Sequence, residues 1–192
     1  ERLGDVRSRA VTMGQVADIL VARGQLDEAL RIRTEELLPV FERLGDVRSR
    51  AVTMGKVADI LVARGQLDEA LRIRTEELLP VFERLGDVRS RAVTMGKVAD
   101  ILVRRGQLDE ALRIRTEELL PVFERLGDVR ELLVCKANIA LTLLNGQRTE
   151  VLPKAVELLV EAHAMAKTHG FLALQQQLEG IVSQFVTKPD AP

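Results

Sequence analysis

The chain has 192 residues, of which 46% are hydrophobic and 30% are charged, and its formal net charge at pH 7 is -1. Charges of both signs are interspersed throughout. This argues against a nucleic-acid or anionic-membrane surface, because either would need a basic patch. Aromatic residues are scarce, with five phenylalanines and no tryptophan or tyrosine, so the chain offers few platforms on which bases could stack.

The single cysteine, Cys135, excludes an internal disulfide and favours a reducing compartment, which we take to be the cytoplasm. No apolar run approaches the roughly 18 residues that would span a bilayer. The chain begins at Glu1, without a methionine and within a repeat, and we therefore expect it to be a fragment of a longer protein.

A sequence of 41 residues recurs in tandem and organises the chain. The copies at 1–41, 42–82 and 83–123 differ at two positions only. Gln15 stands where the later copies have lysine, and Arg104 stands where the earlier copies have alanine. A fixed period of about 20 to 50 residues is typical of repeat arrays, in which each unit buries its apolar face against its neighbours.

Each copy predicts two helices. In the first, at residues 46–64 of the second copy, apolar residues recur every three or four positions and leave only a narrow polar strip. A helix that is apolar on most sides is packed between others. Asp46 is a suitable N-cap, and Gly65 is a suitable left-handed residue at the C-terminal end.

The second predicted helix spans about residues 67–85 and ends at Gly86. Its first turn carries Asp68 and Glu69, which lie near the positive end of the helix dipole. Pro80 lies inside this helix, where a proline loses one backbone hydrogen bond and clashes with the preceding turn. Because the apolar spacing continues past Pro80, we expect a bend and not a break.

After residue 123 the copy becomes divergent. Residues 128–145 predict a fourth first helix, in which the pair Ile139-Ala140 keeps the spacing of the earlier copies. A partner helix follows from about Pro153. Residues 172–186 then predict a last amphipathic helix, whose polar face would close the array.

The spacing of Val57-Ala58, Leu61, Gly65 and Ala70 resembles the tetratricopeptide repeat (TPR). In that family a large–small pair, a second large residue, a glycine turn and an alanine recur at these intervals. The family's usual unit has about 34 residues, and the longer unit here is similar to the variant seen in kinesin light chains and bacterial multidomain proteins. Arg74 and Glu77 depart from the family's pattern on the second helix.

The resemblance implies an all-α fold, an α-solenoid of stacked antiparallel helix hairpins that forms a TPR-like right-handed superhelix. The expected organisation is a single array. Its parts are repeats at 1–41, 42–82 and 83–123, a divergent repeat at 124–170, a C-terminal capping helix at 171–186 and a frayed tail at 187–192.

In the TPR family the polar strip of the first helix lines a concave groove that binds peptides, and the resemblance implies the same here. We call the corresponding residues of this chain the first-helix strip. They are Arg7, Val11, Gly14, Asp18, Arg48, Gly55, Lys56, Asp59, Arg89, Gly96, Lys97, Asp100, Arg104, Arg130, Asn138, Leu141 and Asn145.

Two of the recurring strip residues have a structural and a functional interpretation. Glycine inside a helix costs about 1 kcal/mol relative to alanine, so Gly14 and its copies need either close helix packing or the close approach of a ligand backbone. Asp18 and its copies either face a ligand or pair with Arg48, Lys56 and their equivalents in the next unit. The Lys and Asn that clamp a terminal carboxylate in some TPR proteins are replaced here by Gly14 and Asp18, so that clamp is not expected.

The strip changes towards the C-terminus, where Arg104, Arg130, Asn138, Leu141 and Asn145 replace the repeated residues. This change predicts either the most selective part of the groove or simple drift in a terminal copy. The two histidines, His163 and His169, do not form a ligand pattern with other side chains. No phosphate loop or nucleophile motif is present.

The sequence therefore predicts a non-catalytic scaffold that binds a protein or peptide on the concave surface, without cofactor, metal, nucleic acid or membrane. An alternative is a sensor or regulatory arm of a larger intracellular signalling protein of bacterial type, whose effector domain lies outside this chain. The first helix also lacks an upstream cover. We expect two N-terminal ends to pair through a face formed by Val6, Ala10, Met13 and Ala17.

Overall fold

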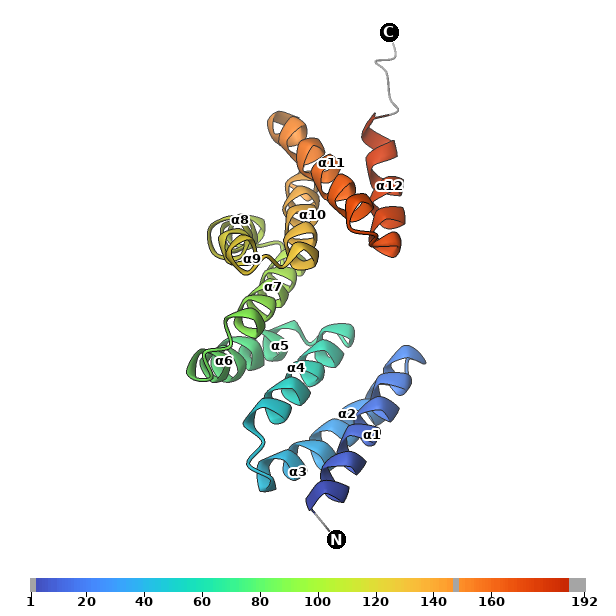
Figure 1. Ribbon diagram of the computed structural model, residues 1–192, viewed down its shortest axis with the longest axis vertical. Coiled ribbons are helices and arrows are strands. Elements are labelled where there is room, and N and C mark those ends of the chain that lie inside the picture. Colours follow the sequence, from blue (N-terminus) through green and yellow to red (C-terminus); the bar gives the residue numbers. More distant parts are fainter. Residues whose placement is uncertain (1–2, 147–148, 187–192) are drawn as a thin grey trace. The chain divides into compact units, whose positions relative to one another are not determined.

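The structure is a computed structural model that describes residues 3–146 and 149–186, and over this range it is all-α. The predicted tail at 187–192 lies outside the described residues. The chain divides into two compact units, Glu1–Thr94 and Met95–Pro192, and the boundary falls inside helix α7. Each unit consists of helices that follow one another as hairpins (Figure 1).

The first helix of each repeat is a regular α-helix. These helices are α1 (Leu3–Ala22), α4 (Val47–Ala63), α7 (Val88–Arg104) and α10 (Val129–Asn145). The predicted caps are confirmed in the second copy, where the Asp46 carboxylate accepts a hydrogen bond from the Ser49 backbone N–H at 3.0 Å. Gly65 follows the helix with a φ of 77°, a conformation that glycine adopts without strain.

The second helix of each of the first three repeats contains a π-helical segment, labelled η, between two short α-helices. The segments are α2 (Leu26–Arg31), η1 (Ile32–Leu37) and α3 (Leu38–Arg43); α5 (Leu67–Arg72), η2 (Ile73–Leu78) and α6 (Leu79–Arg84); and α8 (Leu108–Arg113), η3 (Ile114–Leu119) and α9 (Leu120–Leu126). The prediction that the helix passes Pro80 without a break is confirmed, and the distortion is a π turn just before the proline.

The fourth repeat shows what the π turn accommodates. In the second copy the buried positions of the second helix run from Ala70 to Phe82, a span of 12 positions. In α11 (Leu152–Thr168) the equivalent buried positions run from Ala155 to Ala166, a span of 11, and this helix is regular and has no internal proline. The π turn therefore takes up one additional residue, as expected when hydrogen bonds join residues five apart instead of four apart.

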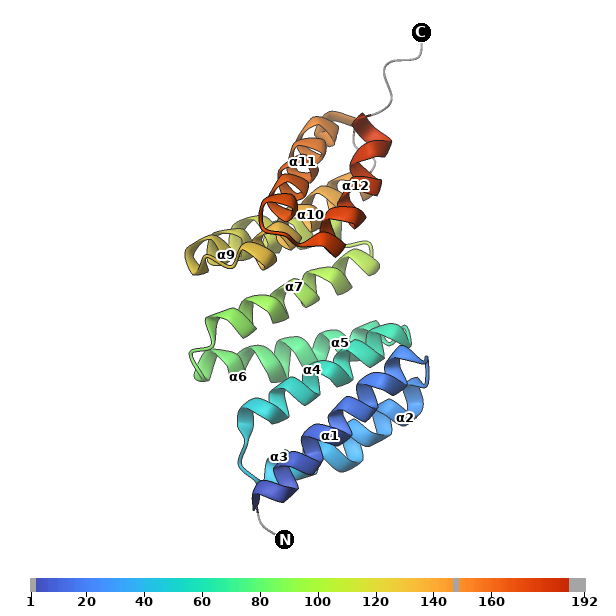
Figure 2. The ribbon, with the colours of Figure 1, turned by 45° about the vertical axis from the view of Figure 1, so that its right-hand side comes forward.

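The hairpins pack through small residues where the two helices cross. Ala58 of α4 and Ala70 of α5 are both fully buried, as the sequence pattern indicates. In the second unit α10 packs against α11, which follows the short 3-10 helix η4 (Thr149–Val151). The last helix, α12 (Leu172–Val186), lies beside α11 (Figure 2) and has the predicted bounds.

Candidate functional site on the first helices

The first-helix strip is solvent-accessible in every copy. Twelve of its members are exposed: Arg7, Val11, Asp18, Arg48, Lys56, Asp59, Arg89, Lys97, Arg104, Arg130, Leu141 and Asn145. The other five are half-buried: Gly14, Gly55, Gly96, Asp100 and Asn138. The strip is therefore a surface that a partner could reach, and its chemistry depends on what lies beneath it.

A buried arginine lies under the aspartate of each of the first three copies. The guanidinium groups of Arg33, Arg74 and Arg115 donate to Asp18, Asp59 and Asp100 at 2.7, 2.6 and 2.6 Å, respectively. Each arginine comes from the π-helical segment of the second helix and is at most 4% exposed. We call these three pairs the Arg–Asp struts, because each one joins the two helices of its hairpin.

Each strut keeps the charged guanidinium group of an arginine in a buried position, where its desolvation is unfavourable. Burial lowers the pKa of Arg33, and the neighbouring Asp18 carboxylate acts against that shift. The Nε atom of Arg33 is buried without a hydrogen-bond partner, so its desolvation is incompletely offset. The aspartate end of each pair is partly in water, with side chains that are 42% to 53% exposed. Each strip aspartate is therefore hydrogen-bonded to a buried arginine and also remains accessible to solvent.

The expected ladder of ion pairs between repeats is half correct. Lys56 pairs with Asp18 of the preceding repeat at 3.3 Å, as anticipated. Arg48, the other expected partner of Asp18, forms no ion pair with it in the described part of the chain. Instead it pairs at 2.7 Å with Asp87, the residue that caps the next first helix, and Arg7 pairs in the same way with Asp46 at 2.8 Å. These strip arginines lie about three helical turns before the strip aspartates of their own helices. They are beside the start of the next first helix, and they therefore pair with the aspartate that caps it.

Close packing does not account for the strip glycines. A Cβ atom built on Gly14, Gly55 or Gly96 would have as its nearest neighbour a leucine methyl at 3.8, 3.7 or 3.6 Å, respectively. These are ordinary van der Waals distances, so an alanine side chain would fit. The explanation that close helix packing requires glycine at these positions is therefore wrong. The alternative, that a ligand backbone approaches these glycines closely, stays a prediction.

The structure corrects the residues that the sequence assigned to an exposed face of α1. Ala10 and Ala17 are 4% and 0% exposed, because they pack against the second helix of their own hairpin. Met13 also packs against that core. The sequence pattern shows which positions of α1 are apolar, but it does not show which of them the partner helix of the hairpin already covers.

The fourth repeat replaces the strut with apolar side chains. Leu141 stands in the place of the strip aspartate, and Leu159, four residues after the crossing Ala155, stands in the place of the buried arginine. Leu159 is 1% exposed. Arg115 of the third repeat also reaches into this region, where it donates to the Asn138 carbonyl at 3.3 Å and to the Thr142 hydroxyl.

An uncharged cavity opens where the strip loses its aspartate. It has a volume of about 120 Å³ and lies between α10 and α12. We call it the α10–α12 cavity, and its lining is Leu133, Val134, Ala137, Asn138, Leu141, Leu174, Gln177, Leu178 and Ile181. The only polar side chains in this lining are the carboxamides of Asn138 and Gln177, each of which offers both a donor and an acceptor.

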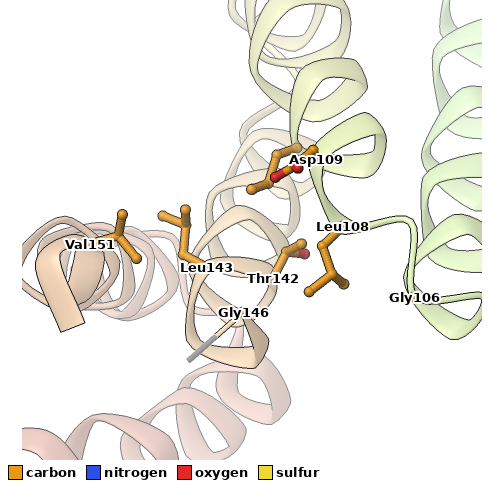
Figure 3. Close-up of a pocket in the computed structure, with 8 residues that line it drawn as sticks. Gly106, Leu108, Asp109, Thr142, Leu143, Gly146 and Val151 are labelled. Atoms are coloured by element: carbon orange, nitrogen blue, oxygen red, sulfur yellow. The ribbon is translucent and has the colours of Figure 1, made fainter. Parts of the chain in front are cut away.

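A second cavity in the same unit has a different origin. It measures about 210 Å³ and is lined by residues from α8, the end of α10 and η4 (Figure 3). Gly146 lies at its edge, where the preceding copies have an arginine, so no long side chain fills the space. This cavity lies off the first-helix strip.

The remaining chemical groups are consistent with a structural role. Burial raises the pKa of the Cys135 thiol to about 12, and the side chain packs against the Arg115 carbonyl. Within residues 3–146 and 149–186 no group of three or more His, Cys, Asp or Glu side chains could hold a metal ion. Over the same residues, none of the helices has both the length and the apolar character required for a bilayer span.

Solved structures resemble this chain in fold at low sequence identity. Nearly identical TPR-like repeats from a kinesin light chain-type protein of Podosopora anserina match with a TM-score of 0.64 and 19% identity, over 96% of this chain and 98% of that one. A variant of those repeats gives the same TM-score and identity over 94% of this chain and 98% of that chain. BtubC (BKLC) from P. vanneervenii matches with a TM-score of 0.52 and 13% identity, over 100% and 96% of the two chains.

The chain has a TPR-like fold. This confirms the all-α solenoid of helix hairpins that the repeat pattern predicts. Searches with the sequence against protein-family models and curated proteins give no significant match. At these identities the likeness concerns the fold alone.

Sequence reasoning missed the buried partners of the strip. Arg74 lies four residues after the crossing Ala70, on the apolar face of its helix, and this position was the available signal that it is buried. Its pairing with Asp59 could have been inferred only by placing the two TPR-like helices against each other. The contribution of α12 to the α10–α12 cavity, through Gln177, had no signal in the repeat pattern because α12 has no copy.

Proposed function

We propose that this TPR-like chain is a non-catalytic scaffold that binds a protein or peptide on its first-helix strip, in the cytoplasm. The mixed charges of the strip favour such a partner over nucleic acid or an anionic membrane. In the first two repeats the aspartates already have cationic partners in Arg33, Lys56 and Arg74, which leaves them less available to a ligand.

The α10–α12 cavity is the observation that carries the proposal. Its volume of about 120 Å³ is well below the roughly 300 Å³ at which small-molecule pockets begin, so it suits one side chain and not a cofactor. The lining is aliphatic apart from Asn138 and Gln177. An aliphatic side chain of a peptide would fill the cavity, while the two carboxamides would bind the peptide backbone on either side of it.

The experiment selects peptides from a random library displayed on phage, with the 192-residue chain as bait. We expect the selected peptides to share one leucine, isoleucine or methionine. Their affinity should fall at least tenfold in Leu141→Asp and in Asn138→Lys, which restore the residues of the third copy at Asp100 and Lys97. Val160→Asp is the matched control, because Val160 is an exposed apolar residue of α11 outside the cavity lining.

Two results would refute the proposal. One is a set of peptides with no common aliphatic residue. The other is an equal loss of affinity in the cavity variants and in the Val160→Asp control, which would place binding elsewhere on the chain. Circular dichroism of each variant would show that the helices remain folded, since Leu141 and Val160 are both exposed.

A further inference from the structure

The cavity of about 210 Å³ between α8 and α10, which we call the α8–α10 cavity, lies wholly within the second unit. Figure 3 shows Leu108 and Asp109 on its α8 side, with Thr142 and Leu143 on its α10 side. Asp109 is the only charged residue of the lining, which otherwise consists of aliphatic side chains, a threonine and two glycines. The cavity therefore combines an apolar wall with a single carboxylate.

The second repeat shows what fills the equivalent place. Gly146 and Asp109 lie two repeat periods after Arg64 and Asp27. In the first unit the Arg64 side chain is 35% exposed and pairs with Asp27 at 3.3 Å. Thr142 likewise stands in the place of the larger Ile60. An arginine side chain thus fits between these two helices, and the fourth repeat has no side chain at the position from which it comes.

The end of α10 also favours a cation in this cavity. Gly146 is the C-cap of α10, and the last turn of this helix contains no basic residue. The carbonyl oxygens of Leu143 and Thr142 lie 3.4 and 3.9 Å from the position that a Cβ of Gly146 would take. The C-terminal carbonyl groups of a helix carry partial negative charge and stabilise nearby cations.

The charged residues that adjoin the lining do not cancel the charge of Asp109. Glu110 is paired with Arg113 at 2.8 Å. Arg105 and Glu150, which precede the lining residues Gly106 and Val151 in sequence, have opposite signs. The cavity and its immediate surroundings are therefore negative by the charge of Asp109.

We propose that the α8–α10 cavity binds an arginine side chain of a partner protein, in the place that Arg64 takes in the second repeat. The methylene groups would pack on the aliphatic wall, and the guanidinium would donate to Asp109 and to the carbonyl end of α10. Asp109 also interacts within its own chain. A second cation is compatible with this, since the Asp18 carboxylate accepts from both Arg33 at 2.7 Å and Lys56 at 3.3 Å.

The test is an NMR titration of the 192-residue chain with N-acetylarginine amide, a probe that carries one arginine side chain and no other charge. We expect saturable shifts of the Leu143, Gly146 and Val151 amides, with a dissociation constant of about 1 mM, which is ordinary for a ligand of this size. N-acetylcitrulline amide has nearly the same shape without the charge. It should bind at least tenfold more weakly.

Two variants, each with a matched control, locate the probe. Asp109→Asn should weaken binding at least tenfold, whereas Asp27→Asn should not, because Arg64 already pairs with Asp27. Gly146→Arg should also weaken binding at least tenfold, because the chain then supplies the arginine of the earlier copies itself. Gly146→Ala leaves the cavity open and should bind as the parent does. The φ of Gly146 is -71°, so both residues are tolerated there, and circular dichroism would verify that the helices remain folded.

The proposal is wrong if the arginine probe causes no saturable shifts at these amides, or if the citrulline probe binds equally well. Equal losses in Asp109→Asn and Asp27→Asn would also contradict it, because they would indicate non-specific attraction of a cation.

A further contrary result concerns Arg148, which follows Gly146 closely in sequence and lies outside the described residues. If the Arg148→Ala chain binds the probe and the parent does not, the cavity takes an arginine of its own chain and not one of a partner. The α8–α10 cavity is separate from the first-helix strip, so none of these outcomes depends on peptide binding at the α10–α12 cavity.

Discussion

Each Arg–Asp strut connects a strip aspartate that is partly exposed to solvent to an arginine that is buried in the core. The strut is a charged pair in a half-buried setting, where the desolvation of the arginine opposes the attraction between the charges. The fourth repeat uses two leucines at the same two positions, Leu141 and Leu159. The chain therefore has a charged pair at these two positions in its first three repeats and an apolar pair in the fourth, and the stabilities of the two arrangements can be compared directly.

We expect Asp18→Leu alone to destabilise the chain by about 3 kcal/mol, because it leaves the Arg33 guanidinium buried without a carboxylate. The double variant Asp18→Leu with Arg33→Leu should come within about 1 kcal/mol of the parent or exceed it. Urea unfolding measures both free energies. A double variant that is about 3 kcal/mol less stable than the parent would show that the strut itself contributes net stability.

The strip glycine can be tested for a structural role. Because a Cβ on Gly55 would meet only a leucine methyl at 3.7 Å, Gly55→Ala should raise the free energy of unfolding by about 1 kcal/mol through helix propensity. The melting temperature of the variant shows the sign of this change in stability. A lower melting temperature would mean that the helices approach more closely than the structure shows.

The aspartate caps should make stability depend on pH. The hydrogen bond from the Ser49 backbone N–H lowers the pKa of Asp46; burial opposes this shift, and the Ser49 hydroxyl and Arg7 add to it. A carboxyl whose pKa is lower in the folded state stabilises the fold above its unfolded pKa, and that contribution disappears as the pH falls through the folded value. Asp46→Asn should thus be less stable than the parent at neutral pH, and the difference should shrink below about pH 4. A gap that stays constant down to about pH 2 would contradict this assignment.

At the scale of single helices, the sequence predicted the regular elements well. The caps at Asp46 and Gly65, the α10 helix and the bounds of α12 follow from local chemistry, which periodicity and capping rules describe. The π turns were not predicted. They depend on how many residues separate the buried positions of the second helix. That spacing is known only once the two helices of the hairpin are packed together.

Because of the π turn, Pro80 should have little effect on the free energy of unfolding. A proline in the interior of a regular helix is unfavourable by about 3 kcal/mol, so its removal would normally stabilise the chain by that amount. Pro80 follows a π turn that already departs from regular hydrogen bonding. We expect Pro80→Ala to change the free energy of unfolding by less than about 1 kcal/mol. A stabilisation near 3 kcal/mol would mean that the spacing of buried residues does not set the π turn.

At the scale of the whole molecule, tandem repetition predicted the TPR-like fold but only part of the candidate site. Repetition shows which positions are equivalent, and so it located the strip from Arg7 to Asn145. It could not show what α12 adds beside Leu141, because that helix occurs once. The division of the chain into four repeats and a capping helix is still a prediction from periodicity.

The central claim is that a partner binds the first-helix strip at the α10–α12 cavity. The most direct measurement is the NMR spectrum of the chain during titration with a peptide selected from the library. Residues 131–186 have no identical copy, so their signals can be assigned without ambiguity. We predict saturable shifts that centre on Asn138, Leu141 and Gln177, including the side-chain carboxamides. Shifts confined to α1, or to the cavity of Figure 3, would contradict the claim.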